Sequence, residues 1–232
     1  MVCMIATAML RTLPDIAPLQ PGKSRLYLCR HGETDSNANK LLQGGGIDAP
    51  LNAVGRQQAT WLAQALSVHR LDLVASSSLC RAVQTADLIA VQQGDVERHR
   101  SDALCEMCYG SMEGMPIAEC KPALAALSEA WKGGQTHIAV GGDGESPEQL
   151  LARGAAVLWG DGGLMRSGPG RHVAVVAHST FNKAVLAHLS GQPLGGFMGI
   201  PQDNACVNVI DAAADGSLEV VSINLAAQPA AL

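Results

Sequence analysis

The chain has 232 residues and a mass of 24.1 kDa, and it is 47% hydrophobic, 16% charged and 3% aromatic. One domain of this length buries about 70–75% of the surface of its unfolded chain, which excludes a largely disordered protein and a disulfide-stapled mini-protein. The 16 Lys and Arg against 21 Asp and Glu leave a net charge of −5, which argues against binding to nucleic acids or anionic membranes. No apolar run reaches the ~18 residues of a membrane-spanning helix.

Residues 1–24 contain three prolines and no sustained hydrophobic period, and they predict a flexible N-terminal extension. A single acidic residue, Asp15, leaves open that this segment belongs to an organellar transit sequence. The seven cysteines are odd in number and scattered, which favours a reducing compartment and therefore the cytoplasm, with an organelle as the alternative. Cys105 and Cys108 form a C-x-x-C pair without a second pair at zinc-ligand spacing, so two packed thiols are favoured over a metal site or a redox pair.

From residue 25 the hydrophobic pattern predicts alternating strands and helices. The apolar run 26–29 indicates a buried strand, and Asn52 is placed to cap a helix whose apolar residues recur every 3.6 residues as far as Leu66. A strand is then expected at 71–75 and a helix at 80–91.

The second half of the chain continues this alternation. Ser146-Pro147-Glu148-Gln149 has the hydroxyl, proline and glutamine that begin a helix, and 173–177 is the strongest strand, followed by a helix at 181–189. The segments 205–210 and 218–223 flank Asp215-Gly216 as an antiparallel hairpin. We therefore predict one α/β domain over residues 25–232, a three-layer α/β/α sandwich whose mostly parallel sheet has an antiparallel C-terminal edge.

Chemically active side chains follow several of these strands. In an open parallel sheet, ligands bind beyond the carboxyl ends of the strands. Two strands run into histidine there, as Cys29-Arg30-His31 and as Val176-Ala177-His178, and Arg81 follows the strand at 71–75. Guanidinium groups bind phosphate oxygens through paired donors, so this edge suggests a phosphate site, over which Glu106 could place a carboxyl group.

The run Arg30-His31-Gly32-Glu33-Thr34, with Asn37 three residues on, resembles the signature of the histidine phosphatase superfamily, which has a phosphoglycerate-mutase-like fold. Further matches follow in the same order along the chain. They lie at 43–59, 76–86, 104–114, 144–146 and 175–191.

The resemblance implies a role for each of these side chains. His31 would be the nucleophile that forms a phosphohistidine, and Glu106 the general acid that later activates water; His178 is the third residue expected to be catalytic. The residues expected to bind the substrate phosphate are Arg30, Asn37, Arg81 and Ser179, and those expected near the rest of the substrate are Gln43 and Gly44. No metal and no cofactor is implied, because cationic side chains would compensate the charge of the transferred group.

Several positions depart from the usual pattern of the family. Ser179-Thr180 stand where two glycines are common, and Asn182-Lys183 where Ile-Arg is usual. These side chains could narrow the site or add contacts to the substrate, so they bear on specificity and not on the presence of the catalytic groups.

The resemblance favours hydrolysis of a small phosphomonoester without nucleic acid, membrane or other macromolecular partner, and it leaves a homodimer open. Mutases of the family carry a longer, more basic insertion between the general acid and the second histidine than lies between Glu106 and His178. Phosphoglycerate mutase-type transfer and a catalytically silent phosphate-binding protein are the two alternatives. Sugar phosphates, phosphoglycolate-like acids and nucleotide fragments all fit as substrates.

Overall fold

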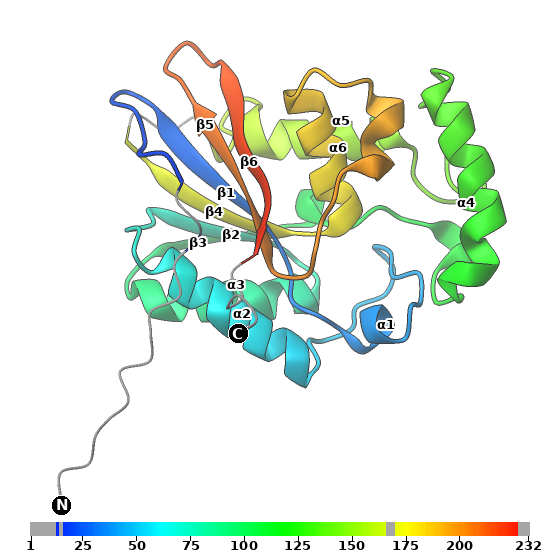
Figure 1. Cartoon of the computed structure of the whole chain (residues 1–232), viewed down its shortest axis with the longest axis horizontal. Coiled ribbons are helices and arrows are strands. Elements are labelled where there is room, and N and C mark those ends of the chain that lie inside the picture. Colours follow the sequence, from blue (N-terminus) through cyan, green and yellow to red (C-terminus); the bar gives the residue numbers. More distant parts are fainter. Residues whose placement is uncertain (1–12, 14–15, 166–169, 227–232) are drawn as a thin grey trace, which may run out of the picture.

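The computed structural model describes residues 13, 16–165 and 170–226, and it places a six-stranded sheet between two layers of helices (Figure 1). The strands are β1 (Ser24–Arg30), β2 (Leu73–Ser77), β3 (Glu97–Ser101), β4 (His172–Ala177), β5 (Cys206–Ala212) and β6 (Leu218–Ala226). Their order is β3-β2-β4-β1-β5-β6, in which β1 to β4 are mutually parallel and β5 and β6 run antiparallel. The predicted α/β sandwich and its antiparallel C-terminal edge are confirmed.

The helices lie on both faces of the sheet. On one face lie α2 (Ala53–Leu66) and α3 (Cys80–Gln93), and on the other α5 (Pro147–Trp159) and α6 (Ser179–Leu189) (Figure 1). Two further helices, α1 (Asp35–Ala38) and α4 (Ile117–Lys132), lie beyond the carboxyl ends of the parallel strands, at the right of the view. The 3₁₀ turns are η1 (Asp102–Leu104), η2 (Gly110–Met112) and η3 (Leu194–Gly199).

Each face of the sheet has its own hydrophobic core. Along β4, Val173 and Val175 belong to the core under α5 and α6, whereas Ala174 and Val176 belong to the core under α2 and α3. This is the two-residue alternation of a strand buried on both faces. It explains why the strand reads as a continuous apolar run in the sequence.

Three elements, β1, β2 and α6, begin two residues away from their predicted starts, and α1, β3 and α4 were not predicted. β2 extends to Ser77 because its serines are buried within the sheet, and α6 already begins at Ser179, ahead of its first apolar residue. The edge strand β3 has no apolar residue, so no hydrophobic pattern in the sequence predicts it. The helix α4 fully buries only Cys120 and Trp131, with Leu124 and Leu127 partly buried between them, and it holds Pro122, a residue that disfavours a helix interior.

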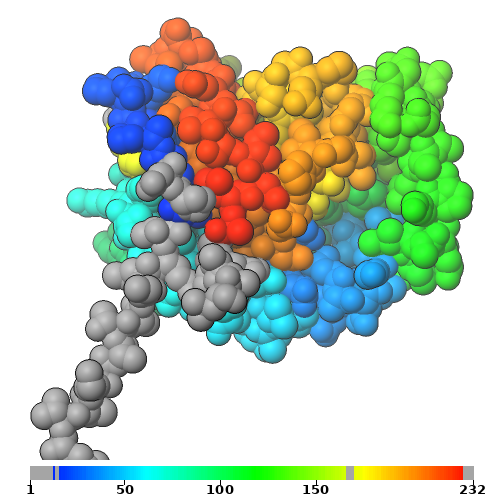
Figure 2. All heavy atoms as spheres, in the orientation of Figure 1, coloured from blue at the N-terminus to red at the C-terminus, as the bar shows by residue number. Residues whose placement is uncertain are grey.

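The segment that carries Leu41 and Leu42 runs beside the start of α4. Leu42 N donates to Met115 O at 2.8 Å, and Gly114 N donates to Leu42 O at 2.9 Å. In the space-filling view these light-blue and green parts of the chain adjoin at the lower right of the molecule (Figure 2). These backbone hydrogen bonds fix the loop that follows α1 against the segment that leads into α4.

The described part of the N-terminal segment lies against the core under α2 and α3. Leu13 is buried there, Ile16 packs against the same cluster, and Ser24 is already the first residue of β1. The predicted flexible extension otherwise concerns residues 1–12, 14 and 15, which lie outside the described residues. None of the helices in the described ranges combines the length and apolar character that crossing a bilayer requires.

Candidate active site

The register between β1 and β4 brings His31 and His178 side by side. Arg30 pairs with Ala177, and the backbone N–H of His31 donates to Ala177 O at 3.1 Å. His31 directly follows Arg30 at the end of β1, and His178 directly follows Ala177 at the end of β4. The two imidazole rings therefore meet beyond the sheet, with their centroids 5.1 Å apart. Both residues are buried, with 3% and 0% of their surface exposed.

The hydrogen bonds of the two rings assign them opposite tautomers. His31 Nδ1 lies 2.6 Å from Gly32 O, and a carbonyl oxygen only accepts, so Nδ1 carries the hydrogen and Nε2 a lone pair. In His178 it is Nδ1 that accepts, from Arg81 Nε at 3.2 Å, which places the hydrogen on Nε2. That buried nitrogen has no hydrogen-bond partner among the described residues.

Both imidazoles are neutral at pH 7. Burial holds the pKa of His31 well below its usual value, and the charges of Arg30 and Arg81 lower it further. Burial and then the charge of Arg81 do the same to the pKa of His178. The site therefore presents one ring nitrogen lone pair, on His31, and one unpaired ring N–H, on the neighbouring His178.

Two guanidinium groups adjoin the histidines, and neither forms an ion pair within the described part of the chain. Arg81 is fully buried and donates to Ile47 O at 2.6 Å and to Gly44 O at 3.1 Å. Arg30 donates to Gln202 O at 2.7 Å, and its buried Nε has no partner among these residues. Positive charge without a paired carboxylate makes this edge of the sheet suited to an anion.

Asn37 belongs to the short helix α1, where its amide orientation is set by two donors. Its Oδ1 accepts from Thr34 N and from Asn204 Nδ2, both at 3.2 Å, while its Nδ2 has no partner among the described residues. Thr34 also donates to Gln43 Oε1 at 2.8 Å, and the buried Nε2 of Gln43 is left unpaired. Two amide donors are thus available beside the histidines.

The remaining two predicted binding residues contribute differently. The carbonyl of Gly44 is engaged by Arg81, so this residue holds a cation in place and its N–H is the group left for a ligand. Ser179 is the first residue of α6, directly after His178, and its hydroxyl makes no hydrogen bond to any described residue.

Glu106 lies between η1 and η2, is 6% exposed, and caps α6 from a distant part of the chain. Its Oε1 accepts from Met107 N at 2.8 Å and Phe181 N at 3.0 Å, and its Oε2 accepts from Thr180 N at 3.0 Å. His178 is the N-cap of α6 but offers no side-chain hydrogen bond to it, so the Glu106 carboxylate satisfies donors that the helix would otherwise leave unpaired.

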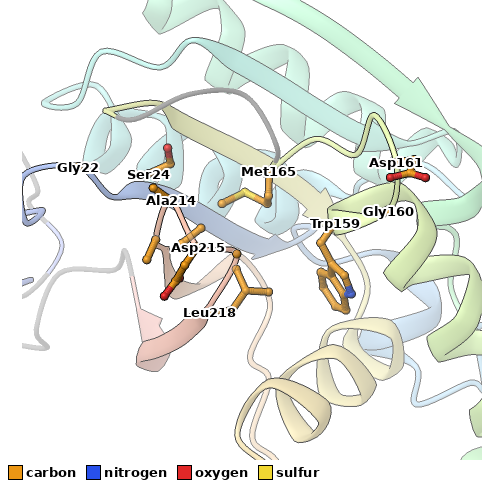
Figure 3. Close-up of a pocket in the computed structure, with 12 residues that line it drawn as sticks. Gly22, Ser24, Trp159, Gly160, Asp161, Met165, Ala214, Asp215 and Leu218 are labelled. Carbon is orange, nitrogen blue, oxygen red and sulfur yellow. The ribbon is translucent and has the colours of Figure 1, made fainter.

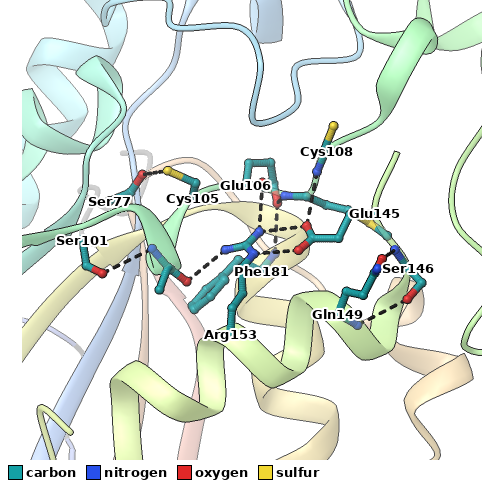
Figure 4. Close-up of polar contacts among 12 residues, drawn as sticks. Ser77, Ser101, Cys105, Glu106, Cys108, Glu145, Ser146, Gln149, Arg153 and Phe181 are labelled. Atoms are coloured by element: carbon teal, nitrogen blue, oxygen red, sulfur yellow. Dashed lines mark hydrogen bonds and ion pairs between the residues drawn. The ribbon is translucent and has the colours of Figure 1, made fainter. Parts of the chain in front are cut away.

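Arg153 holds the loop of Glu106 from the other side (Figure 4). Its guanidinium donates to Glu106 O at 3.1 Å and to Ala103 O at 2.9 Å. It also binds both carboxylate oxygens of Glu145, at 2.7 and 2.9 Å. Arg153 and Glu145 thereby form a fork-shaped, two-point ion pair.

Three polar residues at the site carried no clear signal in the sequence. Gln202 and Asn204 lie in the loop before β5 and contact Arg30 and Asn37, yet that loop has only the composition of a turn. Tyr109 donates or accepts one hydrogen bond with the Thr180 hydroxyl at 2.6 Å, beneath Glu106. For the contact between Tyr109 and Thr180, the one hint in the sequence was that Ser179-Thr180 stand where the family commonly has two glycines.

Lys183 is a further cation near the site. Its Nζ donates to Met198 O at 3.2 Å and forms no ion pair within the described residues. Burial lowers the pKa of Lys183, the charge of Arg30 lowers it further, and Glu106 opposes both effects. Lys183 thus supplies a partly buried ammonium group on α6, five residues after His178.

The C-x-x-C pair forms no disulfide, since Cys105 and Cys108 are both free thiols. Cys105 Sγ lies 3.3 Å from the hydroxyl oxygens of Ser77 and of Ser78, whereas Cys108 points away on the other side of Glu106 (Figure 4). Within the described ranges, no three His, Cys, Asp or Glu side chains are grouped so as to hold a metal ion.

Two cavities are found, of which the first includes Glu106 in its lining and the second lies away from the site. One of about 440 Å³ borders the Glu106 loop and is lined by Asp102, both of these cysteines and the Arg153 pair. A second, of about 730 Å³, lies at the opposite end of the sheet, where Trp159 and Asp161 face Asp215 and Leu218 of the C-terminal hairpin (Figure 3). None of the predicted site residues lines the second cavity.

Comparisons with known proteins agree with this arrangement. Residues 26–225 match the model of the histidine phosphatase superfamily (branch 1). The chain is 33% identical over 156 residues to phosphoglycerate mutase-like protein 4 of Arabidopsis thaliana, which covers 67% of this chain and 66% of that protein. It is 39% identical over 131 residues to the fructose-2,6-bisphosphatase TIGAR of Xenopus tropicalis, which covers 55% of this chain and 46% of that protein.

The aligned part thus spans about half to two thirds of the length of these curated relatives. Among solved structures, the mycobacterial glucosyl-3-phosphoglycerate phosphatase superposes with a TM-score of 0.71 at 26% identity, covering 87% of this chain and 99% of that one. The family model accounts for most of the chain, and its signature residues meet at one edge of the sheet. The chain belongs to the histidine phosphatase superfamily.

Proposed function

We propose that the protein is a metal-independent phosphomonoester hydrolase that works through a phosphohistidine on His31. The observation that carries the proposal is the opposite tautomers of the paired histidines. A neutral His31 offers the Nε2 lone pair to phosphorus, while the unpaired N–H of His178, whose ring centroid is 5.1 Å away, suits a phosphoryl oxygen.

In the first step, a bond forms between His31 Nε2 and phosphorus as the bond from phosphorus to the ester oxygen breaks. Glu106 gives the departing alkoxide a proton. Its Oε2 accepts one hydrogen bond from the protein, from Thr180 N, and so keeps a lone-pair position for that proton. Such proton transfer contributes about 10²–10⁴-fold to the rate.

In the second step, water attacks the phosphohistidine and the P–N bond breaks. Glu106, now deprotonated, takes a proton from the water as the new P–O bond forms. His31 recovers its Nε2 lone pair, and its Nδ1 hydrogen stays on Gly32 O throughout. Inorganic phosphate leaves, and both catalytic groups return to their starting protonation.

The phosphoryl charge is compensated by groups that the protein already holds in place. Arg30 and Arg81 provide unpaired positive charge, and the unpaired N–H groups of His178, Gln43 and Asn37 provide neutral donors. Because these donors are fixed before the reaction, they need no reorganisation as the transferring group flattens. Because these groups compensate the phosphoryl charge, we propose that the reaction needs no metal ion, which is tested by measuring activity in the presence of EDTA.

A phosphorylated sugar or sugar acid with a second anionic group is the substrate class we favour. The named activities of TIGAR and of the mycobacterial phosphatase concern a bisphosphate and a phosphoglycerate derivative. In this chain, Lys183 supplies a partly buried ammonium group without a carboxylate partner among the described residues. A second phosphate or a carboxylate would give that group its counter-charge.

The proposed setting is the cytoplasm, which the scattered, unpaired cysteines favour. There the enzyme would act on a freely diffusing substrate, as a monomer or a homodimer, with residues 25–232 as its catalytic domain.

Phosphate release from a panel of phosphomonoesters, with and without a second anionic group and with EDTA present, tests the proposal. We expect EDTA-resistant release by the wild type, a higher kcat/KM for the doubly anionic esters, and none of this activity in His31→Ala. Interconversion of 3- and 2-phosphoglycerate without phosphate release would establish the mutase alternative. Binding of the esters without any turnover would establish a silent phosphate-binding protein.

A further inference from the structure

The loop between η3 and β5 contacts both ends of the proposed phosphate site. Its Ala205 N donates to His31 O at 3.1 Å. The Asn204 side chain donates from Nδ2 to the same carbonyl, at 3.4 Å, and to Asn37 Oδ1, at 3.2 Å. One amide group therefore bridges the backbone of the proposed nucleophile and the side chain of a proposed phosphate ligand.

The helix that carries Asn37 is anchored mainly through the residues that flank it: Thr34 is buried before it, and Lys40 O accepts from Ile117 N at 2.9 Å after it. α1 is a single turn, Asp35–Ala38, and buries no residue. Among the described residues, the bond from Asn204 is the only hydrogen bond that joins α1 to any part of the chain outside 34–41. Within the described residues, Asn204 is thus the one side chain that links α1 itself by hydrogen bonds to the backbone of His31.

Asn204 is itself held firmly. Gln202 and Asn208 exchange side-chain hydrogen bonds of 2.7 and 3.0 Å, and Asn208 also donates to Leu28 O of β1 at 2.8 Å. Ala205 has φ +55°, a left-handed conformation that a non-glycine residue adopts only where its surroundings require it. The loop is therefore built to present residue 204 at one fixed place.

We propose that Asn204 is a positioning residue that acts through Asn37. It supplies the second of the two donors at Asn37 Oδ1, which leaves both Nδ2 hydrogens available to a ligand. The inference rests on the proposed function for the identity of the anion. The coupling between the two asparagines can nevertheless be measured by binding alone.

A double-mutant cycle with Asn204→Ala and Asn37→Ala tests the proposal through kcat/KM for the best ester of the panel. We expect Asn204→Ala to lower kcat/KM about tenfold, as for loss of one hydrogen bond to a charged group. In the Asn37→Ala background the same change should have no further effect, since its target is gone. An equal fall in both backgrounds, or no fall in either, overturns the proposal.

Asn224→Gly is the matched control. Asn224 holds the same loop by donating to Asp203 Oδ2, touches neither Asn37 nor His31, and has φ +57°, which glycine adopts freely. We expect its kcat/KM to equal the wild-type value, and a tenfold fall would show that any loosening of the loop suffices, which overturns a specific role for Asn204. Should Asn204→Ala not fold, Asn204→Ser takes its place in the cycle.

The same cycle is run with orthovanadate, an oxyanion of phosphate shape, by measuring its dissociation constant. Weaker binding in Asn204→Ala but not in the Asn37→Ala background supports the coupling even if no ester is hydrolysed. If the wild type releases no phosphate from any ester, the proposed function fails while this measurement still decides the role of Asn204.

Discussion

The Glu106 carboxylate accepts a hydrogen bond of 3.0 Å from the backbone N–H of Thr180, two residues after His178. The proposed general acid and the second histidine are thus coupled through the first turn of α6. On its other side the Glu106 loop is bound by Arg153. The distance between acid and histidine is consequently set by backbone contacts and not by a flexible side chain alone.

Arg153→Met is expected to lower kcat at least tenfold with little change in KM. The variant removes the donors to Glu106 O and Ala103 O, so the loop loses its fixed position while the phosphate ligands stay in place. Steady-state kinetics on the best ester measures this, with exposed Arg70→Met as the control. Unchanged kcat in Arg153→Met would show that the loop needs no such support.

Tyr109→Phe is expected to reduce the free energy of unfolding by about 1–2 kcal/mol, because it leaves the buried Thr180 hydroxyl without its partner. Thr180→Val should cost a similar amount by orphaning the Tyr109 hydroxyl. The double variant should cost less than the sum, since neither polar group then remains. Urea unfolding of the four proteins measures the cycle, and strictly additive losses would refute the pairing.

Gly55→Ala is expected to destabilise the protein by about 1–3 kcal/mol and to lower activity. A Cβ at Gly55 would lie 2.0 Å from Glu33 O, so the backbone that carries the signature residues after His31 would have to move. Gly196→Ala is the control, because no atom lies within 4 Å of the added Cβ. Thermal unfolding and kcat are compared, and an unperturbed Gly55→Ala would contradict the close approach.

Folding stability should fall as the pH drops below about 6.5, the usual histidine pKa. The folded state holds the pKa of His31 and His178 well below that value, so in this range the unfolded chain binds more protons than the folded one. The stability is complete above 6.5 and is lost progressively below it. Unfolding free energies from pH 8 to pH 5 measure the slope.

The slope should shrink when His31 and His178 are both replaced by asparagine, and it should persist in His137→Asn, a change at an exposed histidine. An undiminished slope in the double variant would mean that other groups govern the acid side.

The meeting of His31 and His178 was predictable because each follows an apolar strand, and parallel strands end at one edge of a sheet. The sheet order and register were not, although they are what brings the two rings within 5.1 Å. The strand β3 escaped prediction because Glu97–Ser101 owes its place to pairing with β2 and not to any hydrophobic pattern.

Positioning residues were the least predictable part of the site. The bond from Arg153 to Glu106 O depends on how α5 packs against η1. Asn204 lies in a segment that reads as an ordinary turn, and only the antiparallel placement of β5 beside β1 brings it to His31. Contacts of this kind follow from tertiary structure, for which local sequence carries no signal.

Direct capture of the covalent intermediate tests whether His31 is the nucleophile. Wild type and His31→Ala are mixed with the best ester in EDTA, quenched in alkali within one turnover, and analysed by peptide mass spectrometry. We expect one added phosphoryl group on His31 of the wild type, acid-labile as a phosphohistidine is, and none in the variant. Phosphate release by the wild type without any label on His31, or a label on another residue, would contradict that role of His31.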